Sequence, residues 1–285
     1  MRRRRYPSDT TILEWVLVEP LLPVPACQTP SGGRPEAHPR REIVDALIYL
    51  VDTGCKWAAL PQDYPPFKTL FGFFARWSTA GVFNLIRDQL RRRIRRTMGT
   101  SLNPVAAVID SPSVKVAATV PRSTSGYDAG KRPPGRKRHI IVDLKGLPLF
   151  VMVTPADMYD SVAAREALFR LRLMHPEITI VWSDLAYAGT LVGAWAKSFL
   201  HLTIKTVSRP GPQGLRDPAE ALGGETSLAW LSHARRNVRD YETRPEHSES
   251  MLTLASITLM TRRLTRPAVQ PNASMPRSAE PVHAA

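Results

Sequence analysis

The chain has 285 residues and carries 39 Lys and Arg against 25 Asp and Glu, a formal net charge of +14. Hydrophobic residues make up 43% of it, which excludes a wholly disordered protein, and no apolar run approaches the roughly 18 residues that a membrane span needs. Two cysteines form neither a disulfide framework nor a metal cluster, so the composition favours a reducing cytosol and a polyanionic partner.

The positive charge is concentrated in the first half of the chain. Residues 1–150 have a net charge of +12, and the remainder has only +2. Three basic runs account for most of the excess, at residues 2–5, 91–96 and 130–139. One such run alone is typical of a solvated surface, whereas three beside a patterned core favour a phosphate-binding surface. Composition alone does not separate DNA, RNA and a membrane surface.

The first 103 residues predict a series of short helices. Apolar residues at helical spacing mark residues 12–22, 40–54, 65–77 and 82–98, with loops rich in Pro and Gly between them. The second helix is expected to close at Gly54. The last one becomes strongly basic toward its end. Short helices with a basic flank are compatible with a DNA-binding module of the helix-turn-helix type.

After residue 103 the pattern changes to strands that alternate with helices. Short β-branched runs at 105–109 and 178–182 predict buried strands, and residues 139–154 predict a hairpin around a Lys-Gly turn. The remaining predicted elements are helices over 160–174, 190–200 and 225–241 and a strand over 201–208. This order predicts a mixed α/β layer architecture. The tail at 266–285, rich in Pro, Ala and Ser, is predicted to be disordered.

Two aspartates follow apolar strands in the same way. Asp110 comes directly after the run at 105–109, and Asp184 follows the run at 178–182 after one serine. Adjacent strands with carboxylates at corresponding ends bring these groups close together, and hard divalent cations prefer such oxygen ligands. Two-metal phosphoryl-transfer sites hold their ions ~3.5–4 Å apart. Taken alone, however, an aspartate after a strand is more often simple turn chemistry.

A third carboxylate lies on the helix predicted over 225–241. At about 100° per residue, Glu225 shares a helical face with Arg236 and Arg239, while apolar residues occupy the opposite face. A metal-binding carboxylate next to a phosphate-binding strip has this pattern, and so does an ordinary salt-bridged surface helix. The spacing alone leaves both interpretations open.

An ordered series of motifs then covers residues 6–265. It consists of YPSD (6–9), GGRP (32–35), TGCKWAALPQDYPPF (53–67), DSPSVK (110–115), GYDAGK (126–131), GRKRHIIVD (135–143), PADMYDS (155–161), WSDLAYAG (182–189) and ETSLAWLSHARRNVRDYE (225–242). The series resembles the insertion-sequence transposases of the DDE type, in the insertion-sequence-five group. The resemblance implies an RNase H-like catalytic domain over 104–265, with a mixed sheet and flanking helices, preceded by a small all-α, helix-turn-helix-like DNA-binding domain over 1–103.

The resemblance also implies an active site and its partners. Asp110, Asp184 and Glu225 are expected to be the catalytic, metal-binding triad, with two Mg²⁺ ions for which Mn²⁺ can substitute. The implied chemistry is cleavage of DNA strands and their transfer by a 3′-hydroxyl. The implied partners are double-stranded DNA, as terminal inverted repeats and as target, and further copies of the chain. The expected location is the bacterial cytoplasm at the nucleoid, with no membrane contact.

Basic side chains near the triad are the expected DNA-binding residues. They lie just before the predicted hairpin and on the segment after Glu225: Lys131, Arg136, Lys137, Arg138, Arg235, Arg236 and Arg239. An imidazole on a hairpin near a Mg²⁺ site more often contacts phosphate or backbone, so His139 is not expected to be a metal ligand.

Residues 215–224 depart from the family pattern. They read LRDPAEALGG, where relatives carry an apolar stretch followed by Arg-Trp and two apolar residues. The DNA string CTTCGTGATCCTGCCGAAGCGCTGGGTGGT encodes this peptide, and read one nucleotide later it encodes FVILPKRWV and the start of another Val. We therefore infer a local frameshift that is restored at Glu225. Gly223 and Gly224 each cost roughly 1 kcal/mol relative to Ala in a helix, so we expect Glu225 to be poorly placed and the activity to be impaired.

Three functions remain open on the sequence. The leading hypothesis is a DNA transposase. The altered stretch at 215–224 favours a non-catalytic DNA-binding remnant of such an enzyme. A metal-dependent nuclease without strand transfer would carry the same triad.

Overall fold

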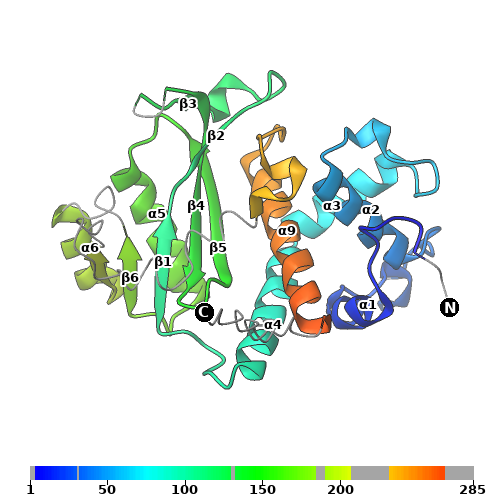
Figure 1. Ribbon diagram of the computed structural model, residues 1–285, viewed down its shortest axis with the longest axis horizontal. Helices are drawn as coiled ribbons and strands as arrows, with labels where there is room; N and C mark the ends of the chain where they lie inside the picture. The colour runs from blue at the N-terminus through cyan, green and yellow to red at the C-terminus, as the bar shows by residue number, and fades with distance from the viewer. Residues whose placement is uncertain (1–3, 31, 130–131, 184–189, 207–230, 267–285) are drawn as a thin grey trace, which may run out of the picture.

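The structure, a computed structural model, describes residues 4–30, 32–129, 132–183, 190–206 and 231–266. In these ranges a mixed β-sheet stands beside a group of helices that comes from both ends of the chain (Figure 1). Within these ranges no helix is both long enough and apolar enough to cross a bilayer.

Four α-helices form from the first hundred residues, as the apolar spacing predicts. They are α1 (Ile12–Val18), α2 (Arg40–Thr53), α3 (Phe67–Thr79) and α4 (Val82–Thr97), with the short 3₁₀ helices η1 (Glu19–Leu21), η2 (Ala26–Gln28) and η3 (Trp57–Ala59) between them. Thr11 and Glu14 form a capping box at the start of α1. α2 ends at Gly54, whose φ of +69° is the left-handed conformation expected at a helix end.

The sheet is built around β1 (Ala106–Asp110). β4 (Pro134–Asp143) pairs with it in antiparallel orientation, and β6 (Ile180–Ser183) pairs with it in parallel orientation, followed by β7 (Thr203–Thr206). β4 and β5 (Pro148–Pro155) form the predicted hairpin. β2 (Ser113–Lys115) and β3 (Gly126–Tyr127) pair with the first residues of β4, with η4 (Arg122–Thr124) between them. β1, β4, β5, β6 and β7 fall in the regions where strands are predicted, whereas β2 and β3 are not predicted.

The two faces of the sheet pack on different helices. α5 (Asp160–Met174) and α6 (Thr190–Leu200) cover one face, where Ile109 and Ile141 join their core. α4 and the last helix, α9 (Pro245–Thr265), cover the other face, where Val108 and Ile140 are buried. Because successive residues of a strand point to opposite faces, β1 contributes to both cores. A mixed sheet with flanking helices after a helical N-terminal region confirms the predicted fold class.

α9 joins the N-terminal helices to the sheet. It lies between them in Figure 1 and contacts α1, α2, α3, α4 and β5. One cluster of buried apolar side chains extends from Leu47 in α2 through Ile257 in α9 to Val151 in β5. The boundary predicted between residues 103 and 104 falls in the connection from α4 to β1. The helices before it share their core with a helix from the far end of the chain, so independent folding of residues 1–103 stays a prediction.

The helix predicted over 225–241 is wrong for residues 233–241. Leu231 and Ser232 are helical, but the chain then turns and forms only the short η6 (Arg235–Asn237). The side chain of Asn237 donates to the Leu231 carbonyl (3.1 Å), and that of Arg236 donates to the Cys55 carbonyl (2.7 Å). These tertiary contacts override the apolar periodicity. Residues 225–230, the stretch 215–224 and the tail from 267 onward lie outside the described residues.

Candidate active site

Asp110 occupies the last position of β1, where the predicted strand ends. The first four residues of β1 are buried, and Asp110 is half-buried. The backbone N–H of Ser111 donates to Oδ1 of Asp110 (2.7 Å), which orients the carboxylate. Asp110 lies opposite Ile140 of the neighbouring strand β4. An oriented carboxylate at the end of a buried strand is the setting that the sequence predicts for a metal ligand.

The parallel strand β6 reaches the same edge of the sheet. Each pair in the β1–β6 register joins residues 74 positions apart, from Ala106 with Ile180 to Val108 with Trp182. β6 ends at Ser183, the last residue before the predicted second aspartate. Asp184, Glu225 and Lys131 lie outside the described residues. Within the described ranges no group of three or more Asp, Glu, His or Cys side chains could hold a metal ion.

The pleat of β4 sorts its polar residues onto two faces of the sheet. Ile140 is opposite Asp110, so Arg138 and Arg136 lie on the face of Asp110. Lys137 and His139 lie on the other face, which α5 covers. Residues adjacent in sequence on this strand therefore have different surroundings.

Three of the arginines predicted to contact DNA are enclosed by the protein. Arg136, Arg138 and Arg236 are 0%, 7% and 7% exposed. Their guanidinium groups donate to backbone carbonyl oxygens of other segments: Arg136 to Glu242 and Thr243, Arg138 to Asn237, and Arg236 to Cys55. The structure thus gives these three side chains internal partners in place of the phosphate contacts that the sequence predicts.

The other predicted DNA contacts differ in exposure. Lys137 is mostly buried: its Nζ lies 3.1 Å from Oδ1 of Asp160 and donates to the carbonyl oxygen of Met158 (2.9 Å). Arg235 and Arg239 are exposed. A phosphate contact by Lys137 therefore requires its pair with Asp160 to open, whereas the two arginines are available at the surface.

The basic run at 91–96 is divided in the same way. Arg91 and Arg95 face the interior, and Arg95 pairs with the fully buried Asp143. Arg92 and Arg96 are exposed. Only part of the charge that the sequence concentrates in this run is therefore presented to solvent.

His139 is fully buried beneath α5. Its Nε2 lies 2.9 Å from Oγ1 of Thr154 on β5. Burial lowers the pKa of His139 to about 4, with the nearby Asp160 and Lys137 acting in opposite directions. The imidazole is therefore neutral at pH 7, and its hydrogen bond to Thr154 links β4 to β5.

Sequence reasoning missed two buried carboxylates, Asp240 and Glu242. Oδ2 of Asp240 lies 3.2 Å from Nη1 of Arg136, and Oε1 of Glu242 accepts from Nε of Arg236 (2.8 Å). Burial raises the pKa of Glu242, and Arg236 opposes the rise. The available signal was the RDYE sequence at 239–242, but alternating charges of this kind are also typical of a solvated surface.

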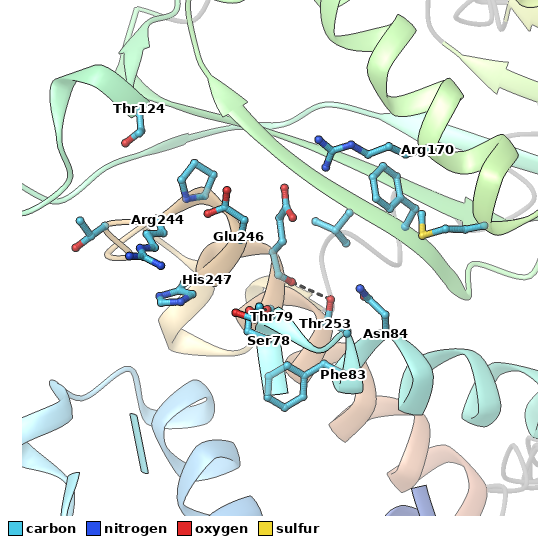
Figure 2. A pocket seen from close by; sticks show the side chains of 18 of the residues that line it. Ser78, Thr79, Phe83, Asn84, Thr124, Arg170, Arg244, Glu246, His247 and Thr253 are labelled. Carbon is cyan, nitrogen blue, oxygen red and sulfur yellow. Dashed lines mark hydrogen bonds between the residues drawn. The ribbon is translucent and has the colours of Figure 1, made fainter. Parts of the chain in front are cut away.

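A groove of about 810 Å³ opens elsewhere on the molecule (Figure 2). Phe83 at the start of α4, Glu246 and His247 at the start of α9 and Arg170 of α5 line it, together with residues of β5. None of its lining residues belongs to β1 or β4. The groove is therefore separate from the strand end that carries Asp110.

Comparisons with known proteins agree with the motifs of the sequence. Residues 102–262 match the model of the transposase DDE domain, and residues 11–87 match that of a transposase of the IS4/5 family. The insertion element IS402 uncharacterized 16.2 kDa protein of Burkholderia cepacia is 24% identical over 122 residues, which are 42% of this chain and 78% of that protein. A chain in the cryo-EM structure of a simian T-cell lymphotropic virus intasome with PP2A regulatory subunit B56 gamma is 15% identical, with a TM-score of 0.37 over 84% of this chain and 80% of that one.

The family follows from the extent of these matches. The DDE domain match alone spans more than half of the chain, and it includes the sheet and Asp110. The IS4/5 match covers α1, α2, α3 and the start of α4. Domains of the DDE type use divalent metal ions, whose preferred ligands are oxygen atoms. The chain therefore belongs to the DDE transposases, and its N-terminal helices are similar to those of an IS4/5 family transposase.

Proposed function

We propose that this chain cuts the ends of an insertion sequence and joins them to target DNA, with Asp110, Asp184 and Glu225 as its catalytic and metal-binding carboxylates. The observation that carries the proposal is the position of Asp110 beside the parallel strand β6. Asp110 is the last residue of β1, and Ser183, the residue before Asp184 in the sequence, is the last residue of β6, which runs parallel to β1. Adjacent strands are about 4.8 Å apart, a spacing at which two carboxylates can share divalent ions.

The donor set favours Mg²⁺, with Mn²⁺ as a substitute. Carboxylate oxygens are the ligands that hard divalent cations prefer. When bound, two such ions supply activation of the attacking oxygen and stabilisation of the leaving oxygen during displacement at phosphorus. Asp110 contributes a carboxylate whose Oδ1 the Ser111 N–H already holds in place (2.7 Å).

Double-stranded DNA is the proposed substrate and partner, both as terminal inverted repeats and as target. Arg235 and Arg239 are exposed on the segment that follows Glu225, where they can meet the phosphates of the strand being cut. Lys131, before the hairpin strand β4, is proposed to add a further phosphate contact. We also propose that copies of the chain assemble on paired ends, at the nucleoid in the bacterial cytoplasm.

The altered stretch at 215–224 favours a second candidate, a DNA-binding remnant without catalysis. The inferred frameshift replaces the residues directly before Glu225 with a segment that ends in two glycines. The coding DNA decides whether the frameshift exists, because its other reading frame must then encode a family-like peptide there. We call a chain with residues 215–224 replaced by FVILPKRWVV the restored chain.

A cleavage and joining assay separates the candidates. The purified chain is incubated with a plasmid that carries the inverted repeats flanking its gene, in Mg²⁺, in Mn²⁺ and in EDTA. Metal-dependent cleavage at the repeats followed by joining to a second plasmid supports the transposase. Cleavage without joining supports a nuclease, and binding without cleavage supports the remnant.

A further inference from the structure

Five charged side chains are buried where the segment after Glu225 meets the sheet. We call them the ionic clamp: Arg136 and Arg138 of β4, and Arg236, Asp240 and Glu242 of the segment 235–243. None of the five is more than 7% exposed. They are the charged part of the interface that attaches this segment to the rest of the protein.

The two arginines of β4 hold the backbone of the segment. Arg136 donates from Nη1 to the Glu242 carbonyl (2.8 Å) and from Nη2 to the Thr243 carbonyl (3.1 Å). Arg138 donates from Nη1 to the Asn237 carbonyl. Because these bonds reach carbonyl oxygens at both ends of residues 237–243, they fix the position and direction of the chain relative to β4.

Asp240 attaches the same segment to β2 and α9. Its backbone N–H donates to the Lys115 carbonyl (2.9 Å), and its own carbonyl accepts from the N–H of Ala117 (2.8 Å). Its carboxylate accepts from Oγ of Ser248 (2.7 Å) and pairs with Arg136. One residue thus extends the ladder of β2 and contacts the first turns of α9.

Arg236 and Glu242 attach the segment to the N-terminal helices. Nε and Nη2 of Arg236 lie 2.8 Å and 2.7 Å from the same oxygen, Oε1 of Glu242. Nη1 of Arg236 donates to the carbonyl of Cys55, just after the end of α2 (2.7 Å). The segment is therefore connected to the sheet, to α9 and to α2 at once.

The ionic clamp is expected to add little to the stability of the fold, but it fixes the relative positions of the elements that it joins. Removing charges from water is unfavourable, and well-packed apolar side chains often replace buried ion pairs without loss of stability. Several directional contacts among three elements, however, permit few relative positions. β4 is the strand that lies beside Asp110, and Arg138 is two residues from Ile140, the partner of Asp110. Glu225 lies six positions before Leu231, where the described segment begins.

We propose that the ionic clamp is the positioning unit of the active site: it holds the chain that follows Glu225 against the strand beside Asp110, so that the carboxylates meet in one geometry. The inference rests on the proposed function. The five side chains are positioning residues, because they act through Asp110 and Glu225 and not on the DNA directly.

The kinetic test compares two Glu-to-Gln changes that each break a pair with arginine. Glu242→Gln weakens the buried pair, and Glu166→Gln breaks the exposed pair of Glu166 and Arg170 on α5. Cleavage rates are normalised to the concentration of chains that bind DNA, so a loss of folded protein does not count. We expect Glu242→Gln to lower kcat about 100-fold with KM unchanged, since a displacement near 1 Å has that effect. The kcat of Glu166→Gln should equal that of the parent, and the kcat of Arg236→Lys should lie between those of the parent and Glu242→Gln.

A distance measurement tests the clamp without relying on activity. Spin labels are placed at Val238→Cys and Val105→Cys, both exposed, after Cys27→Ser and Cys55→Ser. The parent and Glu166→Gln should give one narrow distance, and Glu242→Gln a broadened distribution. A narrow distance distribution together with an unchanged kcat in Glu242→Gln would overturn the proposal that the ionic clamp positions the active site. If neither the parent nor the restored chain cleaves, the proposed function fails, and the distance alone decides whether the clamp holds the segment.

Discussion

At the scale of single residues, several of the arginines that the sequence predicts to contact DNA are buried inside the protein. Arg91 is fully buried, and among the described residues its three guanidinium nitrogens have no hydrogen-bond partner, with Oδ1 of Asp88 at 3.8 Å from Nε. Burial lowers the pKa of Arg91. Arg136 is equally buried but fully engaged by neighbouring segments. Net charge therefore overstates the basic surface that can meet a phosphate backbone.

The partly buried carboxyl group of Glu249 gives a pH-dependent prediction. Its Oε1 accepts the N–H of Val153 in β5 (2.9 Å), and partial burial raises its pKa from about 4.5 to about 7. Between these values the folded chain binds the proton more tightly than the unfolded chain, so this group's contribution to stability falls as pH rises from about 4.5 through about 7. Glu249→Gln removes the ionisable group. The substitution should therefore stabilise the protein by ~3 kcal/mol at pH 8, where Glu249 is ionised, but not at pH 4.

Urea unfolding at the two pH values checks this prediction. Glu246→Gln, at an exposed position of the same helix, is the matched control and should change stability little at either pH. A gain from Glu249→Gln that is equal at pH 4 and pH 8 would show that charge burial is not its cause.

At the scale of elements, the end of α2 depends on a glycine for two separate reasons. Gly54 has a φ of +69°, and a Cβ added there would lie 3.1 Å from the carbonyl carbon of Arg235. Gly81, between α3 and α4, has a φ of +68° but no atom within 4 Å of an added Cβ. Gly81→Ala should therefore cost about 1 kcal/mol from backbone strain alone, and Gly54→Ala should cost more.

The free energies of unfolding of the two glycine variants, measured in urea, separate strain from contact. A larger loss for Gly54→Ala is expected, because the added methyl group pushes against the segment that the ionic clamp holds. Equal losses in the two variants would contradict the close contact between α2 and Arg235.

Helices and strands that follow from the apolar pattern of their own residues were predictable from the sequence. The β-branched run before Asp110 gives β1, and the apolar spacing at 160–174 gives α5 over the same residues. The arginines of β4 were not predictable as buried, because Arg136 meets the Glu242 carbonyl across 106 positions of sequence. The helix expected through residue 241 failed for the same reason, because Arg236 bonds to the Cys55 carbonyl across 181 positions. Periodicity reports which face is apolar, but it carries no information about such distant polar partners.

At the scale of the whole molecule, one core unites the two ends of the chain. α9 packs against the sheet and against the N-terminal helices, and the segment 235–243 enters the same junction. DNA bound by the helical part would therefore be held in a defined position relative to Asp110. Coupling of this kind suits an enzyme that must place one phosphodiester bond at its carboxylates.

The stretch at 215–224 is predicted to limit the activity of the whole protein. If a frameshift displaced the residues before Glu225, the restored chain should cleave about 100-fold faster than the present chain with similar affinity for the DNA ends. Single-turnover cleavage and a binding titration measure the two quantities. A restored chain that binds more tightly but cleaves no faster would place the defect in DNA binding and contradict the account of Glu225.

The most direct test of the carboxylate site is metal-dependent cleavage of the element's terminal repeats by the restored chain and by the same chain with Asp110→Asn. The substitution preserves size but removes the charge that a divalent cation needs. We predict that Asp110→Asn abolishes cleavage in Mg²⁺ and in Mn²⁺ and leaves DNA binding within about twofold. Cleavage that persists in Asp110→Asn at the parent rate would contradict the assignment of the active site to the end of β1.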